Sequence, residues 1–141
     1  MDDVIKSKEK FSIIMLDIDY FKDINDIYGH LAGDLVLRTL ANIISANIRK
    51  GYDWVARYGG DEFIIFLKNA DSKTANNIIK EIQFDFKYSN IRFDNYLIQT
   101  TISFGSYTHN GNLGNMDDIL NMVDINLNMA KKSGRNMIIS S

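Results

Sequence analysis

The chain has 141 residues, 45% of them apolar and 24% charged, a net charge of −2, and neither cysteine nor proline. This length predicts one domain with a real hydrophobic core, and the composition argues against disorder. The lack of cysteine excludes a disulfide scaffold, a thiolate zinc site and a cysteine nucleophile. The charge balance argues against a nucleic-acid partner, and no apolar run approaches the roughly 18 residues of a transmembrane helix. With a polar start unlike a signal peptide, we expect a cytoplasmic location.

The first part of the chain predicts a strand followed by helices. The uniformly apolar run 11–18 is typical of a buried strand, and the polar stretch 19–33 after it is interpreted as a short helix or turn. Segment 34–49 has its apolar residues at helical spacing, and Gly51 is interpreted as the stop of this helix.

The middle of the chain predicts a hairpin, a helix and further strands. Segment 53–58 alternates as a strand, a Gly-Gly turn follows, and the apolar segment 63–67 is interpreted as a second strand, so the pair predicts a β-hairpin. Segment 71–86 has a helical apolar stripe. Segment 91–108 is rich in aromatic and β-branched residues, which favour strands, and Gly105 is interpreted as a candidate bulge.

The last part of the chain predicts a helix at 116–132 and a short final strand at 136–140. The resulting order of elements is β-α-α-β-β-α-β-α-β. This order favours an α+β fold with a largely antiparallel sheet and helices on its faces.

Carboxylates gather at the ends of two predicted strands. Asp17 and Asp19 have the two-residue spacing that places both on one face of a strand, and Asp61 and Glu62 follow glycines at the predicted hairpin tip. Like charges brought together are costly unless a cation neutralises them, and a hard divalent ion such as Mg²⁺ suits oxygen ligands. The glycines permit positive φ or a close approach of a ligand. On spacing alone, solvated turn acids are an equally good interpretation.

Four ordered motifs then carry a family resemblance. They are LDIDYFKDINDIYGHLAGD at 16–34, RYGGDEF at 57–63, TTISFGSY at 100–107 and AKKSGRN at 130–136. Together they resemble the GGDEF family, the diguanylate cyclases, from about residue 11 to the end of the chain. The resemblance implies a mostly antiparallel sheet flanked by helices, akin to nucleotidyl cyclases and polymerase palm domains.

The activity that this resemblance implies is the condensation of two GTP molecules into cyclic di-GMP, with release of two pyrophosphates. It implies two Mg²⁺ ions per active site, with Mn²⁺ as an alternative, and a transient or regulated homodimer in which two GTP-loaded domains face each other. It also implies a longer parent protein with a sensory or regulatory domain.

The resemblance also assigns roles to residues. It implies Asp17, Asp61 and Glu62 as catalytic residues and metal ligands, with the Ile18 carbonyl as a further ligand; Glu62 is either a ligand or a contributor to deprotonating the attacking hydroxyl. The residues implied to bind guanine and phosphate are, for guanine, Asn25 and Asp34, and, for phosphate, Lys22, Lys131, Arg135, backbone N–H groups near Tyr20 and Phe21, and the open turn at Gly59 and Gly60.

Each of these roles has a plainer alternative. The spacing of Lys131 and Arg135 suits the phosphate role, because residues four apart lie on one helical face, but both could simply complement a helix C-terminus. Asp34 could be a helix cap and Asn25 an ordinary turn residue. Asp19 is interpreted as structural, bonding nearby backbone.

Two departures from the family pattern carry expectations. Where many members have an inhibitory R-x-x-D product site, this chain has Lys50 and Asp53, and lysine lacks the bidentate grip of arginine. We therefore expect a degenerate inhibitory site with weak or absent product inhibition. The family's leading helix has no counterpart in the sequence, so we expect residues 1–141 to be a single GGDEF domain that lacks it.

Two other functions remain open at this point. One is a catalytically silent module that binds GTP or cyclic di-GMP as a sensor or interaction domain. The other is a metal-dependent nuclease or polymerase-like enzyme, which shares the acids but needs a broad basic face that the charge balance does not supply.

Overall fold

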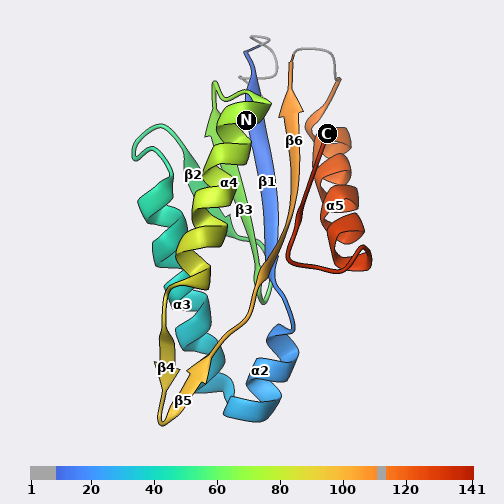
Figure 1. Cartoon of the computed structure of the whole chain (residues 1–141). Coiled ribbons are helices and arrows are strands. Elements are labelled where there is room, and N and C mark those ends of the chain that lie inside the picture. The colour runs from blue at the N-terminus through green and yellow to red at the C-terminus, as the bar shows by residue number, and fades with distance from the viewer. Residues whose placement is uncertain (1–8, 111–113) are drawn as a thin grey trace.

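A five-stranded sheet forms the centre of the protein, with helices on both of its faces (Figure 1). The computed structural model describes residues 9–110 and 114–141. In chain order, the elements are β1 (Phe11–Ile18), α2 (Phe21–Tyr28), α3 (His30–Asn47), β2 (Trp54–Arg57), β3 (Glu62–Lys68), α4 (Ser72–Lys87), β4 (Ile91–Phe93), β5 (Tyr96–Ile98), β6 (Ile102–His109), α5 (Met116–Lys132) and β7 (Ile138–Ser140).

The strand order is β2-β3-β1-β6-β7, and every neighbouring pair is antiparallel except β6 with β7. The predicted α+β class and mostly antiparallel sheet are confirmed, as is the hairpin of β2 and β3. The predicted final strand is shorter, because it begins only at Ile138.

Strand β1 is buried along its whole length because both faces of the sheet are covered. Its residues alternate between two cores. Ile14 and Leu16 belong to the core under α3 and α4, whereas Ile13 and Met15 belong to the smaller core under α5. This period of two explains why the sequence of a strand with two covered faces shows a continuous apolar run and no alternation.

Helix α3 differs from the prediction at both ends. It begins at His30, four residues before the predicted start, because Gly29 with φ 95° makes the turn from α2 directly into α3. It ends at Asn47, before Gly51, which lies with φ 78° in the turn that leads into β2. The helix therefore ends two residues before the predicted end at 49, and the interpretation of Gly51 as its stop is wrong.

Segment 91–108 contains two structures. Strands β4 and β5 form a separate two-stranded sheet beside the N-terminal half of α3, and β6 joins the main sheet (Figure 1). The rings of Tyr28 and Tyr96 lie 5.4 Å apart, which links this small sheet to α2.

Gly105 is not a bulge, contrary to the sequence interpretation. Strand β6 pairs with β1 in an unbroken register from Phe11 opposite His109 to Ile18 opposite Ile102. The glycine is required by helix α5, since a Cβ at this position would lie 2.3 Å from the backbone nitrogen of Leu127.

His109 is expected to make folding sensitive to acid. It is 1% exposed and stacks on Phe11 at 4.8 Å, and neither ring nitrogen has a hydrogen-bond partner within the described residues. Burial lowers the pKa of His109, so the unfolded chain binds a proton at a higher pH than the folded domain does. The free energy of unfolding should therefore decrease as the pH falls below about 6.5, the ordinary pKa of histidine.

Thermal unfolding at pH 7.5 and pH 5.0 tests this expectation. His109→Leu should lose less melting temperature than the wild type between the two pH values, while the same change at the exposed His30 should leave the difference unaltered. An identical acid-induced loss in wild type and His109→Leu would contradict it.

Candidate active site

Antiparallel pairing brings the predicted acids together at one end of the sheet. Asp17 lies near the C-terminal end of β1, and its Cα partners are Glu62 at the start of β3 and Ser103 in β6. Asp61 directly precedes Glu62, in the turn that joins β2 to β3. Residues some 45 positions apart in the sequence thus form one acidic cluster, comprising Asp17, Asp61 and Glu62.

The electrostatics of this cluster centre on Asp17, which is only 6% exposed. Burial, together with hydrogen bonding and charge repulsion from Asp61, raises the pKa of Asp17 to about 7. Lys131 at the end of α5 opposes this rise, because its ammonium forms an ion pair with the Asp17 carboxylate. The same Lys131 Nζ lies 4.0 Å from Glu62 Oε1. The lysine therefore bridges the two acids.

The cluster offers oxygen donors, which suit a hard divalent cation. Across residues 9–110 and 114–141, no three His, Cys, Asp or Glu side chains are arranged so that they could hold a metal ion. In this arrangement the positive charge beside Asp17 and Glu62 comes from Lys131. A divalent cation would compete with Lys131 for Asp17, and Glu62 would complete the donor set on leaving the lysine.

The turn before Glu62 is held by Arg57, which the sequence analysis did not single out. Its guanidinium donates to the carbonyl oxygens of Gly59 at 3.2 Å and Gly60 at 3.0 Å. Neither glycine has a left-handed φ, so backbone freedom is not why glycine stands here. A Cβ on Gly60 would meet nothing within 4 Å, and one on Gly59 would lie 3.2 Å from Glu62 Oε2. The turn is open above Gly60 and tight beside Glu62.

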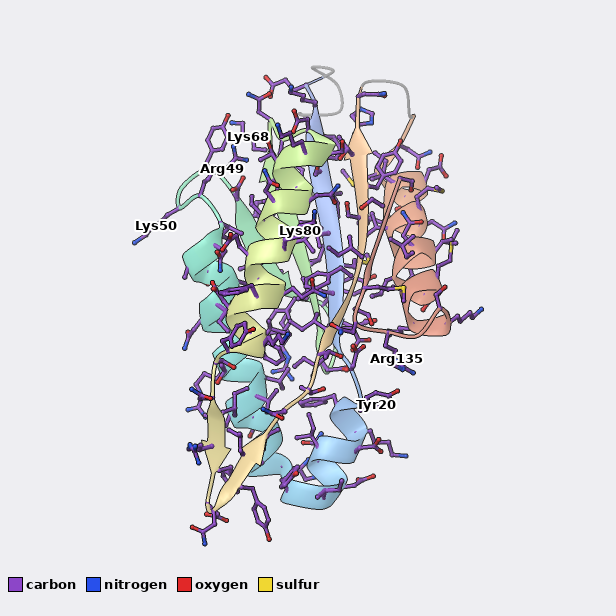
Figure 2. The ribbon with its side chains drawn as sticks, in the orientation of Figure 1. Tyr20, Arg49, Lys50, Lys68, Lys80 and Arg135 are labelled. Carbon is purple, nitrogen blue, oxygen red and sulfur yellow. The ribbon has the colours of Figure 1, made fainter. Side chains whose placement is uncertain are left out.

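Arg135 and Tyr20 meet beside the acidic cluster. The Arg135 guanidinium lies 5.0 Å from the centre of the Tyr20 ring, and Figure 2 shows both side chains at the junction of β1 and α2. Tyr20 precedes α2 with φ 58°, so Phe21 and exposed Lys22 open the helix there. Lys131 and Arg135 do not share a helical face, contrary to the sequence interpretation, because α5 ends at Lys132 and Arg135 lies beyond it with φ 65°.

The predicted guanine-binding residues both lie where α2 meets α3. Asn25 packs so closely against Gly33 that a Cβ there would lie 1.9 Å from Asn25 Oδ1. Asp34 is the next residue and is exposed within α3, so it is not the cap of that helix. It borders a hollow of about 490 Å³ that is otherwise lined by Leu37, Arg38, Ala41, Arg57 and Phe63.

Asp53 is engaged from within the chain. It is 8% exposed, and the Arg49 guanidinium grips it with two hydrogen bonds of 2.8 Å. The backbone N–H groups of Arg49 and Lys68 donate to it as well, at 2.8 Å and 3.1 Å. Because α3 ends at Asn47, Arg49 is free of helical geometry and turns back onto Asp53. Lys50 is exposed and points away from the ribbon (Figure 2).

Comparison with known proteins now decides the family. Residues 1–137 match the family described as diguanylate cyclase, GGDEF domain. The chain belongs to the GGDEF family. This GGDEF domain is 40% identical over 96% of its length to diguanylate cyclase A of Treponema denticola, and 36% identical over 94% to diguanylate cyclase DgcM of Escherichia coli K12. It spans only 36% and 31% of the lengths of these two relatives.

Solved structures share the fold closely. Diguanylate cyclase SiaD of Pseudomonas aeruginosa, in complex with its activator SiaC, matches 99% of this GGDEF domain and 53% of its own chain, with a TM-score of 0.91 and 28% identity. The active GGEEF domain of a Vibrio cholerae diguanylate cyclase matches 99% of this domain and 87% of its own chain, with a TM-score of 0.88 and 31% identity. The predicted family and fold are confirmed. No helix in the described parts of this domain is long and apolar enough to cross a membrane.

Proposed function

We propose that this GGDEF domain condenses two GTP molecules into cyclic di-GMP and releases two pyrophosphates. The observation that carries the proposal is the meeting of Asp17, Asp61 and Glu62 with Lys131 at the end of the sheet, next to Arg135. Three carboxylates and two cations in one place would supply both the metal ligands and the phosphate contacts that the reaction needs.

The carboxylates of Asp17, Asp61 and Glu62 and the Ile18 carbonyl would hold Mg²⁺, with Mn²⁺ as an alternative. When bound, the ions activate the attacking ribose hydroxyl and offset the negative charge of the phosphates. Glu62 either remains a ligand or helps to remove the hydroxyl proton. Since Lys131 pairs with Asp17 in the described structure, the proposal requires Lys131 to leave Asp17 and move to the β- and γ-phosphates.

Arg135, Lys22 and the backbone N–H groups of Tyr20 and Phe21 would contact the same phosphates. Three observations support this: Tyr20 and Arg135 are in contact, Lys22 is exposed in the first turn of α2, and this turn leaves N–H groups without helical partners. The open space above Gly60 and the small Gly59 would admit the triphosphate.

One such site holds one GTP, so the reaction requires a second copy of the domain facing the first. We therefore propose a homodimer, transient or regulated, at the moment of turnover. We also propose a cytoplasmic location, where GTP is found, and a longer parent protein whose sensory domain controls the pairing. The expected absence of the leading helix concerns residues 1–8, which lie outside the described residues, and it stays a prediction.

The decisive experiment incubates the domain with GTP and Mg²⁺ and separates the products by chromatography. Cyclic di-GMP and pyrophosphate should appear, at a rate that rises more than linearly with protein concentration. GTP binding without any cyclic dinucleotide at high protein concentration would favour the second candidate, a module that binds GTP or cyclic di-GMP without turnover. The ion pair between Lys131 and Asp17, which occupies a metal ligand, is the observation that favours that candidate.

Asp34→Ser is expected to relax the choice of base. A carboxylate accepts hydrogen bonds from the guanine N1 and N2 groups and repels the acceptor N1 of adenine, whereas serine does neither. Discrimination between GTP and ATP, measured as the ratio of their binding constants, should fall by about tenfold or more. An unchanged ratio would remove Asp34 from the base site. Asp26→Ser, at an exposed acid on α2, serves as the control.

Product inhibition is expected to be weak or absent. Asp53 already accepts four hydrogen bonds from the chain, and Lys50 cannot form the planar double contact that arginine makes. Turnover should therefore stay nearly constant when micromolar cyclic di-GMP is added, and Lys50→Arg should change this little because Asp53 stays engaged by Arg49. Half-maximal inhibition of the wild type at micromolar product would contradict the expectation.

A further inference from the structure

The turn that follows α5 has an unusual backbone. Gly134, Arg135 and Asn136 are three consecutive residues with positive φ, at 121°, 65° and 50°. Non-glycine residues adopt such values at a cost, and they persist only where surrounding contacts hold them. This turn carries Arg135, so whatever holds the turn also sets the direction of the Arg135 guanidinium.

Asp19 holds the turn. The backbone N–H of Asn136 donates to Asp19 Oδ2 at 3.0 Å, across 117 positions of sequence. Thr101 Oγ1 donates to the same oxygen at 2.5 Å, and Ser103 Oγ donates to Asp19 Oδ1 at 2.7 Å. The backbone of Asp19 is fixed too, since its N–H donates to the Thr101 carbonyl at 2.8 Å. Both ends of this carboxylate and its own main chain are therefore immobilised.

Asp19 works without a cation. It is 1% exposed, and within the described residues no lysine, arginine or histidine nitrogen lies within 4.0 Å of its carboxylate. The three donors are two hydroxyls and one peptide N–H. Hydrogen bonds from these neutral donors replace the water that the buried carboxylate has lost. Because the donors have fixed positions, they also fix the position of the carboxylate.

Asp19 lies in the chain between the acidic cluster and the residue that contacts Arg135. It lies two residues after Asp17 and directly before Tyr20, whose ring carries the Arg135 guanidinium at 5.0 Å. One carboxylate thus joins the end of β1, where the acidic cluster begins, to the turn that carries Arg135.

We propose that Asp19 is a positioning residue that keeps Arg135 directed at the triphosphate. The role rests on the proposed function, because it acts on GTP through Arg135. It extends the sequence interpretation, in which Asp19 was structural and bonded to nearby backbone: the contact is distant in sequence and holds Asn136, the residue directly after Arg135.

A double-mutant cycle tests the role by GTP binding in the presence of Mg²⁺ at concentrations of protein that allow no turnover. Asp19→Asn keeps the shape of the side chain but removes its charge and one acceptor pair. GTP affinity should fall about tenfold, while affinity for guanosine, which has no phosphate, should stay within about twofold. In an Arg135→Ala background, adding Asp19→Asn should lower GTP affinity by less than about twofold.

The sign of this effect separates positioning from electrostatics. Removing a negative charge near the triphosphate would by itself strengthen GTP binding, so a loss requires that Arg135 has been displaced. Ser103→Ala is the matched control, because it removes the donor to Oδ1 and leaves the bond from Asn136 to Oδ2 in place. This control should keep GTP affinity within about twofold of the wild type.

Three results would overturn the role. Unchanged or tighter GTP binding by Asp19→Asn, an equal loss of guanosine binding, or additive losses with Arg135→Ala would each show that Asp19 does not act through Arg135. Should Asp19→Asn fail to fold, the same cycle is run with Asp19→Ser, which removes the carboxylate that accepts from the Asn136 N–H, and additivity there overturns the role equally. A wild-type domain that binds no GTP would overturn the proposed function and this role with it, whereas the other results leave the proposed function standing.

Discussion

The Asp17→Asn variant is expected to lose cyclic di-GMP formation by about 10³-fold or more and, without metal, to melt several degrees above the wild type at pH 8. Asparagine keeps the shape of the side chain but cannot supply the anionic oxygen that a divalent ion needs. Burial and the neighbouring Asp61 make the ionised Asp17 carboxylate unfavourable in the folded domain, where its pKa is about 7.

The pH dependence of this gain follows from the direction of the pKa shift. Because the pKa of Asp17 rises from 3.8 to about 7 on folding, the folded domain keeps a proton that the unfolded chain has already released. The free energy of unfolding therefore falls as the pH rises from about 4 to about 7. Asp17→Asn lacks this penalty, so its advantage should be small at pH 4 and fully developed at pH 8.

Thermal unfolding at pH 4 and pH 8 without divalent ions checks the predicted gain in stability, and product formation with Mg²⁺ checks the predicted loss of activity. Asp124→Asn, at an exposed acid on α5, should change neither. Added Mg²⁺ should raise the melting temperature of the wild type and not that of Asp17→Asn. An Asp17→Asn variant that melts below the wild type at pH 8 would contradict the pKa argument, and one that retains turnover would remove Asp17 from the metal site.

Gly105→Ala is expected to lower the melting temperature by about 10 °C and to weaken GTP binding. The added Cβ would lie 2.3 Å from the Leu127 nitrogen and 2.5 Å from the Val123 carbonyl oxygen. Both are backbone atoms of α5, and no side-chain rotation relieves the overlap. Helix α5 must shift away from the sheet, and it carries Lys131 away from Asp17 as it does so.

Gly114→Ala is the matched control, since a Cβ there meets nothing within 4 Å. Its melting temperature should stay within about 2 °C of the wild type, which corresponds to less than about 1 kcal/mol. If Gly105→Ala also changed the melting temperature by less than about 2 °C, the close contact between β6 and α5 would not contribute to stability. A destabilised variant with unchanged GTP affinity would show that the α5 position does not govern the phosphate contacts.

Local pattern was sufficient for most of the elements. Helix α5 has the predicted bounds, and β1 lies at the predicted apolar run. Both could be predicted because the spacing of apolar residues along the chain shows which faces of a helix or strand are buried. The acids at the strand ends were found for the same reason. The order of the four motifs was enough to identify the family.

Contacts between segments distant in the sequence could not be predicted from local pattern. The partner of Asp53 is Arg49 and not Lys50, because α3 ends early enough for the chain to turn back. Gly105 resembles a bulge in isolation, and only the approach of α5 shows why glycine is needed there.

The fold class, the family and the residue types of the candidate site can all be predicted from the amino-acid sequence, since periodicity and motif order depend on neighbours along the chain. How those residues meet is visible only in the folded domain, where Lys131 pairs with Asp17, Arg135 lies beyond the end of α5, and Asp19 bonds to Asn136. Asp17 and Lys131 lie 114 positions apart, and no local preference encodes a bond of that span. It forms because β1 and α5 pack in the same core, so the chemistry of the site depends on packing that only the complete fold provides.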